Sequence, residues 1–121
     1  MSLQGCTIVI VEPDDLLRGL LERWLGDAGS WVVASAKDLI PTMVKPQLVI
    51  ADISDPGSAG ATIEALRAAY SAPVLALSAR FRRGLGVSSE AAQRLHVEKV
   101  LPKPFTRDEL LAAVREAVEE R

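Results

Sequence analysis

Five short apolar runs recur along the chain without the regular alternation of polar and apolar positions. The runs cover residues 7–11, 31–33, 48–51, 74–77 and 99–101. A strand with one wet face alternates polar and apolar residues, whereas a strand covered on both faces is apolar throughout. The runs are therefore predicted to be strands of a sheet that is buried on both faces.

Between these strands, apolar residues recur at the three- and four-residue spacing of a helix. The first such segment follows Asp14 and Asp15, which can cap a helix, and it ends at Gly26 or Gly29. The last segment begins with a capping box at 106–109, Thr-Arg-Asp-Glu. Further helices are expected within 38–44, after Gly60 and within 89–95.

The order of these elements predicts the fold class. Strands and helices alternate, and short connections between non-alternating strands imply a doubly wound α/β domain with a five-stranded parallel sheet and helices on both faces. The crossovers should be right-handed. The chain shows no repeat, low-complexity segment or linker, so we expect one domain over 1–121, structured from about 6 to 119.

Composition and charge exclude several classes of function. The chain has 121 residues, enough for one domain with a real core. Its formal net charge of -2 does not attract the chain to nucleic acid or to an anionic membrane. No apolar run approaches the roughly 20 residues that a membrane-spanning helix needs. The single cysteine, Cys6, excludes an internal disulfide. We therefore expect a cytoplasmic protein that binds neither nucleic acid nor membrane directly.

Polar side chains follow the strands where the strands end. Glu12 and Asp14 come after the first strand, Asp52 after the third, Ser78 after the fourth and Lys103 after the fifth. Open parallel sheets bind ligands outside the carboxyl ends of their strands, so these residues should converge on one edge.

Clustered carboxylates repel each other unless a cation or a proton relieves them, and Mg²⁺ suits a site of carboxylates and phosphate oxygens. Beside such a cation, an aspartate can attack a phosphoryl group, and a lysine and a hydroxyl can hold the phosphoryl oxygens. The residue set therefore predicts phosphoryl transfer to Asp52, with Ser78 and Lys103 as hydrogen-bond donors to the phosphoryl oxygens.

Three segments together resemble the motifs of two-component response regulator receiver domains, the CheY-like family. Residues 48–57 resemble the phosphoacceptor segment, residues 74–79 the fourth strand with its switch hydroxyl, and residues 101–105 the Lys-Pro-Phe signature. The match spans almost the whole chain in the right order. It implies a flavodoxin-like sheet with the strand order 2-1-3-4-5.

The resemblance also implies roles for single residues. Asp52 would accept a phosphoryl group from a bacterial histidine kinase or a phosphotransfer protein. Ser78 would bind one phosphoryl oxygen, Lys103 would pair with another, and Pro104 would follow a cis peptide bond. Such a domain is a signalling switch with at most self-phosphorylation and slow autodephosphorylation, so its status as an enzyme stays open.

The acidic positions after the first strand depart from the family pattern. The family has two adjacent acidic residues there, the second a direct metal ligand, whereas this chain has Glu12 and then Pro13, which offers no carboxylate. The implied Mg²⁺ ligands are Glu12, Asp52 and the backbone carbonyl of Ser54. Asp14 could replace the missing ligand directly or through water, or Glu12 could reach further toward the ion; the alternative role of Asp14 is to cap the helix. We expect phosphorylation that survives but needs more Mg²⁺.

Two alternatives stay open. The chain has Val100 where the family often has a Tyr or Phe whose rotamer follows the switch hydroxyl. Together with Pro13, this favours a pseudo-receiver that acts as a phosphate-independent interaction module. The other alternative is a flavodoxin-like binder of a small ligand, which the aromatic content of 4% disfavours. The sequence leaves open the partner kinase, the output, a homodimer, and whether the domain stands alone or belongs to a larger protein.

Overall fold

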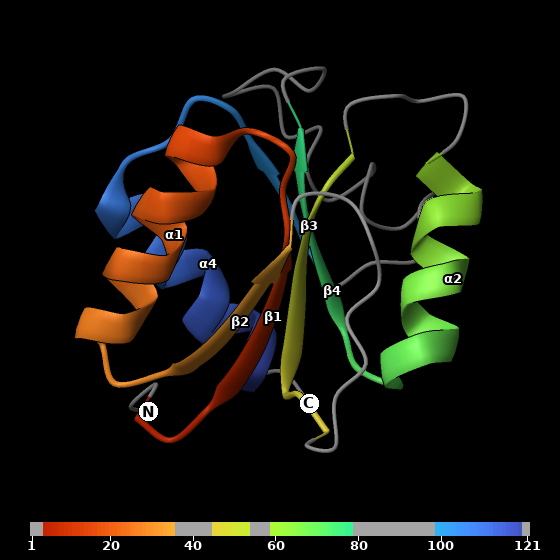
Figure 1. The fold of residues 1–121 in the computed structure, drawn as a ribbon, viewed down its shortest axis with the longest axis horizontal. Coiled ribbons are helices and arrows are strands. Elements are labelled where there is room, and N and C mark those ends of the chain that lie inside the picture. Colours follow the sequence, from red (N-terminus) through yellow and green to blue (C-terminus); the bar gives the residue numbers. More distant parts are fainter. Residues whose placement is uncertain (1–3, 36–44, 54–58, 79–98, 120–121) are drawn as a thin grey trace.

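A parallel sheet of five strands lies at the centre of the protein, with helices on both of its faces (Figure 1). The computed structural model describes residues 4–35, 45–53, 59–78 and 99–119. The strand order is β2-β1-β3-β4-β5, and every neighbouring pair is parallel. This confirms the predicted doubly wound α/β fold and its strand order. The strands are β1 (Thr7–Val11), β2 (Trp31–Ser35), β3 (Leu48–Asp52), β4 (Val74–Ser78) and β5 (Lys99–Pro102).

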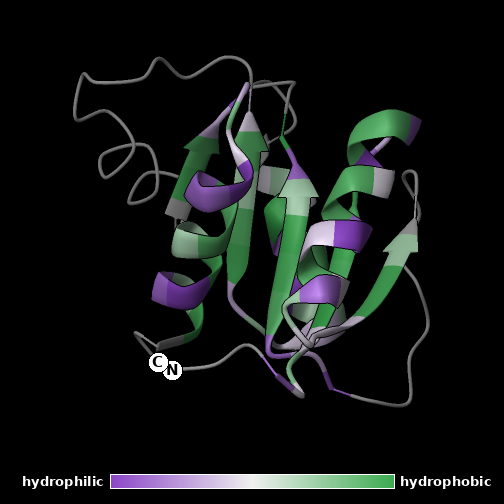
Figure 2. Ribbon diagram, turned by 90° about the vertical axis from the view of Figure 1, so that its left-hand side faces the viewer, coloured by the Kyte–Doolittle hydropathy of each residue, from purple (hydrophilic) through white to green (hydrophobic). Residues whose placement is uncertain are grey.

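Three helices lie within the described ranges, and they divide the core into two layers. Helices α1 (Asp15–Asp27) and α4 (Arg107–Glu119) pack on one face of the sheet, and α2 (Ala59–Tyr70) packs on the other (Figure 1). Successive strand residues point to opposite faces, so Ile8 lies in the α1 and α4 layer while Val9 lies in the α2 layer. The strands are hydrophobic along their length because both faces are covered (Figure 2).

The helix ends follow the capping signals of the sequence. Asp14 is the N-cap of α1, where its Oδ1 accepts a hydrogen bond of 3.0 Å from the backbone N–H of Leu17. At α4, the N–H of Thr106 donates to Glu109 Oε1 at 2.8 Å, and the N–H of Glu109 donates to Thr106 Oγ1 at 3.1 Å. The predicted capping box is therefore confirmed.

Two sequence predictions concern segments outside the described residues, namely the short helices expected within 38–44 and 89–95. The helix expected after Gly60 is observed as α2, which begins at Ala59. In the described part of the chain, no helix is long and apolar enough to cross a membrane.

Candidate functional site

Strand register brings two acidic residues together at the carboxyl edge of the sheet. Val11 of β1 pairs with Ala51 of β3, so the next residues along these strands, Glu12 and Asp52, follow side by side. Both strands are central in the sheet, and the covering layers on each face restrict the access of water. Glu12 is 1% exposed and is one of the few buried polar residues in the described part of the protein.

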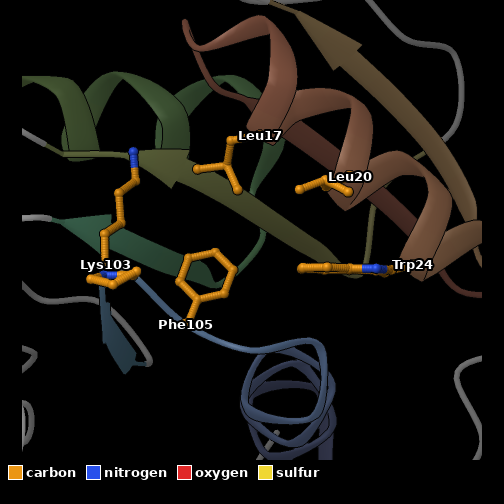
Figure 3. A pocket seen from close by; sticks show the side chains of 6 residues that line it. Leu17, Leu20, Trp24, Lys103 and Phe105 are labelled. Atoms are coloured by element: carbon orange, nitrogen blue, oxygen red, sulfur yellow. The ribbon is translucent and has the colours of Figure 1, made fainter.

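The neighbouring strands contribute the hydroxyl and the ammonium. Ser78 ends β4 and pairs with Pro102 of β5, and the backbone N–H of Lys103 donates to the carbonyl of Ser78 at 2.9 Å. Ser78 is fully buried. The Lys103 side chain extends from the connection between β5 and α4 toward the ends of the neighbouring strands (Figure 3).

Lys103 joins the two carboxylates. Its Nζ lies 2.7 Å from Oδ1 of Asp52, to which it donates a hydrogen bond, and 2.9 Å from Oε1 of Glu12. The exposed fractions of the side chains are 19% for Lys103, 10% for Asp52 and 1% for Glu12. Water screens these buried charges poorly. Among the described residues, the Lys103 ammonium is therefore the main positive charge that offsets the two carboxylates.

The protonation of Lys103 reflects this environment. Burial alone lowers the pKa of a lysine, because it disfavours the charged form. Here the hydrogen bond to Asp52, the ion pair with Glu12 and the negative charges of both carboxylates outweigh burial, so the pKa of Lys103 is raised above its usual value. The side chain is therefore an ammonium at neutral pH and can hold anionic oxygens.

The two oxygens of Glu12 have different partners. Oε2 accepts a hydrogen bond of 3.1 Å from the backbone N–H of Asp14. Oε1 is buried, lies in the ion pair with Lys103, and accepts no hydrogen bond from the described residues. A buried carboxylate oxygen without a hydrogen-bond donor is a suitable ligand for a hard cation such as Mg²⁺. Glu12 and Asp52 therefore fit such an ion with one carboxylate each.

Among the residues that the structure describes, no third carboxylate lies beside these two. Pro13 is exposed, and Oδ1 of Asp14 is engaged by the N–H of Leu17 at the start of α1. Among the described residues there is no group of three or more His, Cys, Asp or Glu side chains that could hold a metal. The remaining implied ligand, Ser54, lies outside the described residues.

An apolar groove adjoins the site on the side of α1 (Figure 3). It has a volume of about 360 Å³, and its lining residues come from α1 and from the connection between β5 and α4. They are Leu17, Leu20, Trp24, Lys103, Pro104 and Phe105. Lys103 thus separates the acidic edge of the sheet from an open apolar surface.

Comparisons with known proteins found a curated relative by sequence and solved structures of the same fold. The chain is 31% identical over 122 residues to protein PetR of Rhodobacter capsulatus, a match that covers 94% of this chain and 49% of PetR, so the chain spans about half the length of that curated relative. A response regulator from Thermotoga maritima superimposes with a TM-score of 0.78 at 19% identity, covering 95% of this chain and 98% of that one. A response regulator receiver protein from Burkholderia phymatum gives 0.74 at 23% identity, covering 95% and 96%. No protein-family model matches the chain.

The chain has the CheY-like receiver-domain fold. The Lys103–Pro104 peptide bond is cis, as the resemblance to receiver domains implied. Val100, the departure from the receiver pattern on β5, is fully buried and packs in the layer that contains α2. A valine in that position has no polar or aromatic group to present at the surface of the receiver fold.

One residue near this site was missed by sequence reasoning. Arg18 donates from Nη1 to the backbone carbonyl of Glu12 at 2.9 Å and from Nη2 to Asp15 Oδ1 at 2.6 Å. The spacing of Asp15 and Arg18 on one helix is a sequence signal for the ion pair. No pattern in the sequence signals the bond to Glu12, because that bond depends on how the chain turns between β1 and α1.

Proposed function

We propose that this chain is a phosphoacceptor receiver domain that takes a phosphoryl group onto Asp52 and passes on the signal by a conformational change. The supporting observation is the contact of Lys103 Nζ with Asp52 Oδ1 at 2.7 Å, beside the buried carboxylate of Glu12. The proposed donor is a histidine kinase or a phosphotransfer protein in a bacterial cytoplasm. The bacterial sources of the similar proteins support this choice.

In the proposed reaction, a carboxylate oxygen of Asp52 attacks the phosphorus of a phosphohistidine. The new O–P bond forms while the N–P bond breaks, and the imidazole nitrogen of the donor keeps the electron pair. The ammonium of Lys103, already next to Asp52, offsets the charge on the phosphoryl oxygens. The hydroxyl of Ser78, at the end of the neighbouring strand, is proposed to donate a second hydrogen bond to the phosphoryl oxygens.

Glu12 and Asp52 are the side chains that would hold Mg²⁺, and a bound ion would supply positive charge that reduces the repulsion between Asp52 and the incoming phosphoryl group. With Pro13 in place of a second acidic residue, a bound ion would have one carboxylate ligand fewer than receiver domains usually offer. We therefore expect phosphorylation to require more Mg²⁺ than in a receiver domain with both acidic residues.

The test is incubation with a small-molecule acyl phosphate and Mg²⁺, followed by the mass of the intact protein. We expect a gain of one phosphate that is absent in Asp52→Asn. Asp27→Asn is the matched control, since Asp27 is an exposed aspartate at the far end of α1, and this variant should gain phosphate like the wild type. A gain that persists in Asp52→Asn would refute the assignment of the phosphoacceptor.

A second candidate is a pseudo-receiver that binds partners without phosphate. Pro13 and the buried Val100 favour it, because the first removes a metal ligand and the second removes the residue whose rotamer reports on the switch hydroxyl. No mass gain at any Mg²⁺ concentration, with the protein folded, would favour this candidate over the phosphoacceptor.

A further inference from the structure

The connection between β1 and α1 is held by a side chain from the first turn of the helix. Arg18 reaches back six residues, and its Nη1 donates to the carbonyl of Glu12 at 2.9 Å. Its Nη2 pairs with Asp15 Oδ1 at 2.6 Å. The Arg18 side chain is 21% exposed, whereas that of Asp15 is 85% exposed, so the bond to Glu12 lies on the buried side of the guanidinium.

The bond from Arg18 holds Glu12, one of the two carboxylates at the carboxyl edge of the sheet. Glu12 is held at its carbonyl by Arg18, at Oε2 by the N–H of Asp14 and at Oε1 by the ion pair with Lys103. Pro13 restricts the backbone between the first two of these contacts. Holding the Glu12 backbone in this position therefore keeps its carboxylate within reach of both the Asp14 N–H and the Lys103 ammonium.

We propose that Arg18 is a positioning residue, which holds the Glu12 carboxylate beside Lys103 and so prepares the site for a divalent cation. The cation part of this inference rests on the proposed function, whereas the placement of Glu12 does not. Arg18 reaches the site through the backbone carbonyl of Glu12, so its effect on Lys103 is indirect.

A guanidinium suits this task better than an ammonium. Arginine presents its N–H donors in a rigid planar fork, so one side chain can bond two oxygens in different directions at once. An exposed ion pair such as Arg18–Asp15 contributes little by itself, because water screens it. The bond to the Glu12 carbonyl is therefore the contact on which the positioning depends.

The first test uses the metal-free protein. NMR spectra would follow the carboxyl carbon of Glu12 and the ammonium of Lys103 in Arg18→Gln, with Arg23→Gln as the matched control, an exposed arginine on the same helix. We expect Arg18→Gln to shift the Glu12 carboxyl signal and to speed exchange of the Lys103 ammonium protons with water, while Arg23→Gln changes neither. Unchanged signals in a folded Arg18→Gln would overturn the proposal, whether or not the domain accepts phosphate.

The second test separates the two bonds of Arg18. Asp15→Asn weakens the ion pair but leaves the bond to Glu12, so its spectrum should match the wild type at Glu12 and Lys103. An effect of Asp15→Asn as large as that of Arg18→Gln would overturn the assignment to the carbonyl bond.

The third test is a Mg²⁺ titration followed by tryptophan fluorescence, without any phosphodonor. We expect Arg18→Gln to bind Mg²⁺ about tenfold more weakly than the wild type, as is typical when a residue that orients a metal ligand is lost. Equal affinities of the two proteins would refute the cation part of the proposal. Wild-type protein that binds Mg²⁺ but takes no phosphate would instead contradict the proposed function and leave the role of Arg18 standing.

Discussion

Removing the ammonium of Lys103 should reduce the stability of the folded protein. In Lys103→Met, the chain keeps a side chain of similar length but loses the positive charge between Glu12 and Asp52. These carboxylates are 1% and 10% exposed, so water cannot replace the lost partner effectively. We expect the substitution to destabilise the fold at neutral pH.

The size of this effect follows from burial. Removing one partner of a buried ion pair costs about 3–5 kcal/mol, because it leaves an uncompensated charge in the interior. Lys103 itself is 19% exposed, which places the expected loss at the lower end, about 3 kcal/mol. This is a large part of the roughly 5–15 kcal/mol that separates a folded domain from its unfolded chain.

The loss should depend on pH in a defined direction. Because the pKa of Lys103 is raised in the folded wild type, its stabilising contribution is complete below the ordinary lysine pKa of 10.5 and is lost as pH rises through the folded-state value. The difference in the free energy of unfolding between wild type and Lys103→Met should therefore be complete at neutral pH and should narrow as pH rises above 10.5.

The assay is urea unfolding of both proteins at pH 7 and above pH 10.5, followed by tryptophan fluorescence. Lys45→Met is the matched control, since Lys45 is exposed, and it should change the free energy of unfolding by less than about 0.5 kcal/mol. A loss at pH 7 below about 1 kcal/mol, the range of exposed ion pairs, would refute the reasoning. A loss of the same size at every pH would also refute it.

Three further predictions follow from the site and the core. Pro13→Asp adds a carboxylate beside Glu12, so it should raise Mg²⁺ affinity and lower the stability of the metal-free protein; a titration showing unchanged affinity would contradict this. Thr106→Ala removes a partner of the capping box and should cost about 1 kcal/mol in urea unfolding, and no measurable loss would count against the role of the cap. Leu21→Ala, at a fully buried position of α1, should cost about 2–5 kcal/mol, whereas Leu16→Ala, at an 83% exposed position, should be nearly neutral; similar losses in the two would contradict the described packing.

Some properties of the site were predictable because sequence alone restricts them. The apolar runs predicted strands covered on both faces, and parallel strands bring their carboxyl ends to one edge. Register then places Glu12 and Asp52 side by side, and Lys103 follows at the end of β5. The prediction that these residues converge needed only the order of the elements and the residue after each strand.

Other properties depended on directions that no local pattern contains. The sequence allowed two roles for Asp14, a helix cap or a metal ligand. In the structure Asp14 caps α1, because its carboxylate accepts a hydrogen bond from the N–H of Leu17. The link from Arg18 to the Glu12 carbonyl and the contact of Glu12 Oε1 with Lys103 Nζ were not predictable either.

Some properties were predictable from the sequence and others were not because they depend on interactions at different distances along the chain. Periodicity and helix caps depend on residues within a few positions of each other, so the sequence by itself determined the strands, the starts of α1 and α4, and which polar residues follow the strands at the edge of the sheet. The direction of each side chain at that edge depends on rotamers and on backbone turns set by packing between distant strands. Only the tertiary structure therefore decided that Lys103 joins Glu12 to Asp52 and that Arg18 holds Glu12 in place.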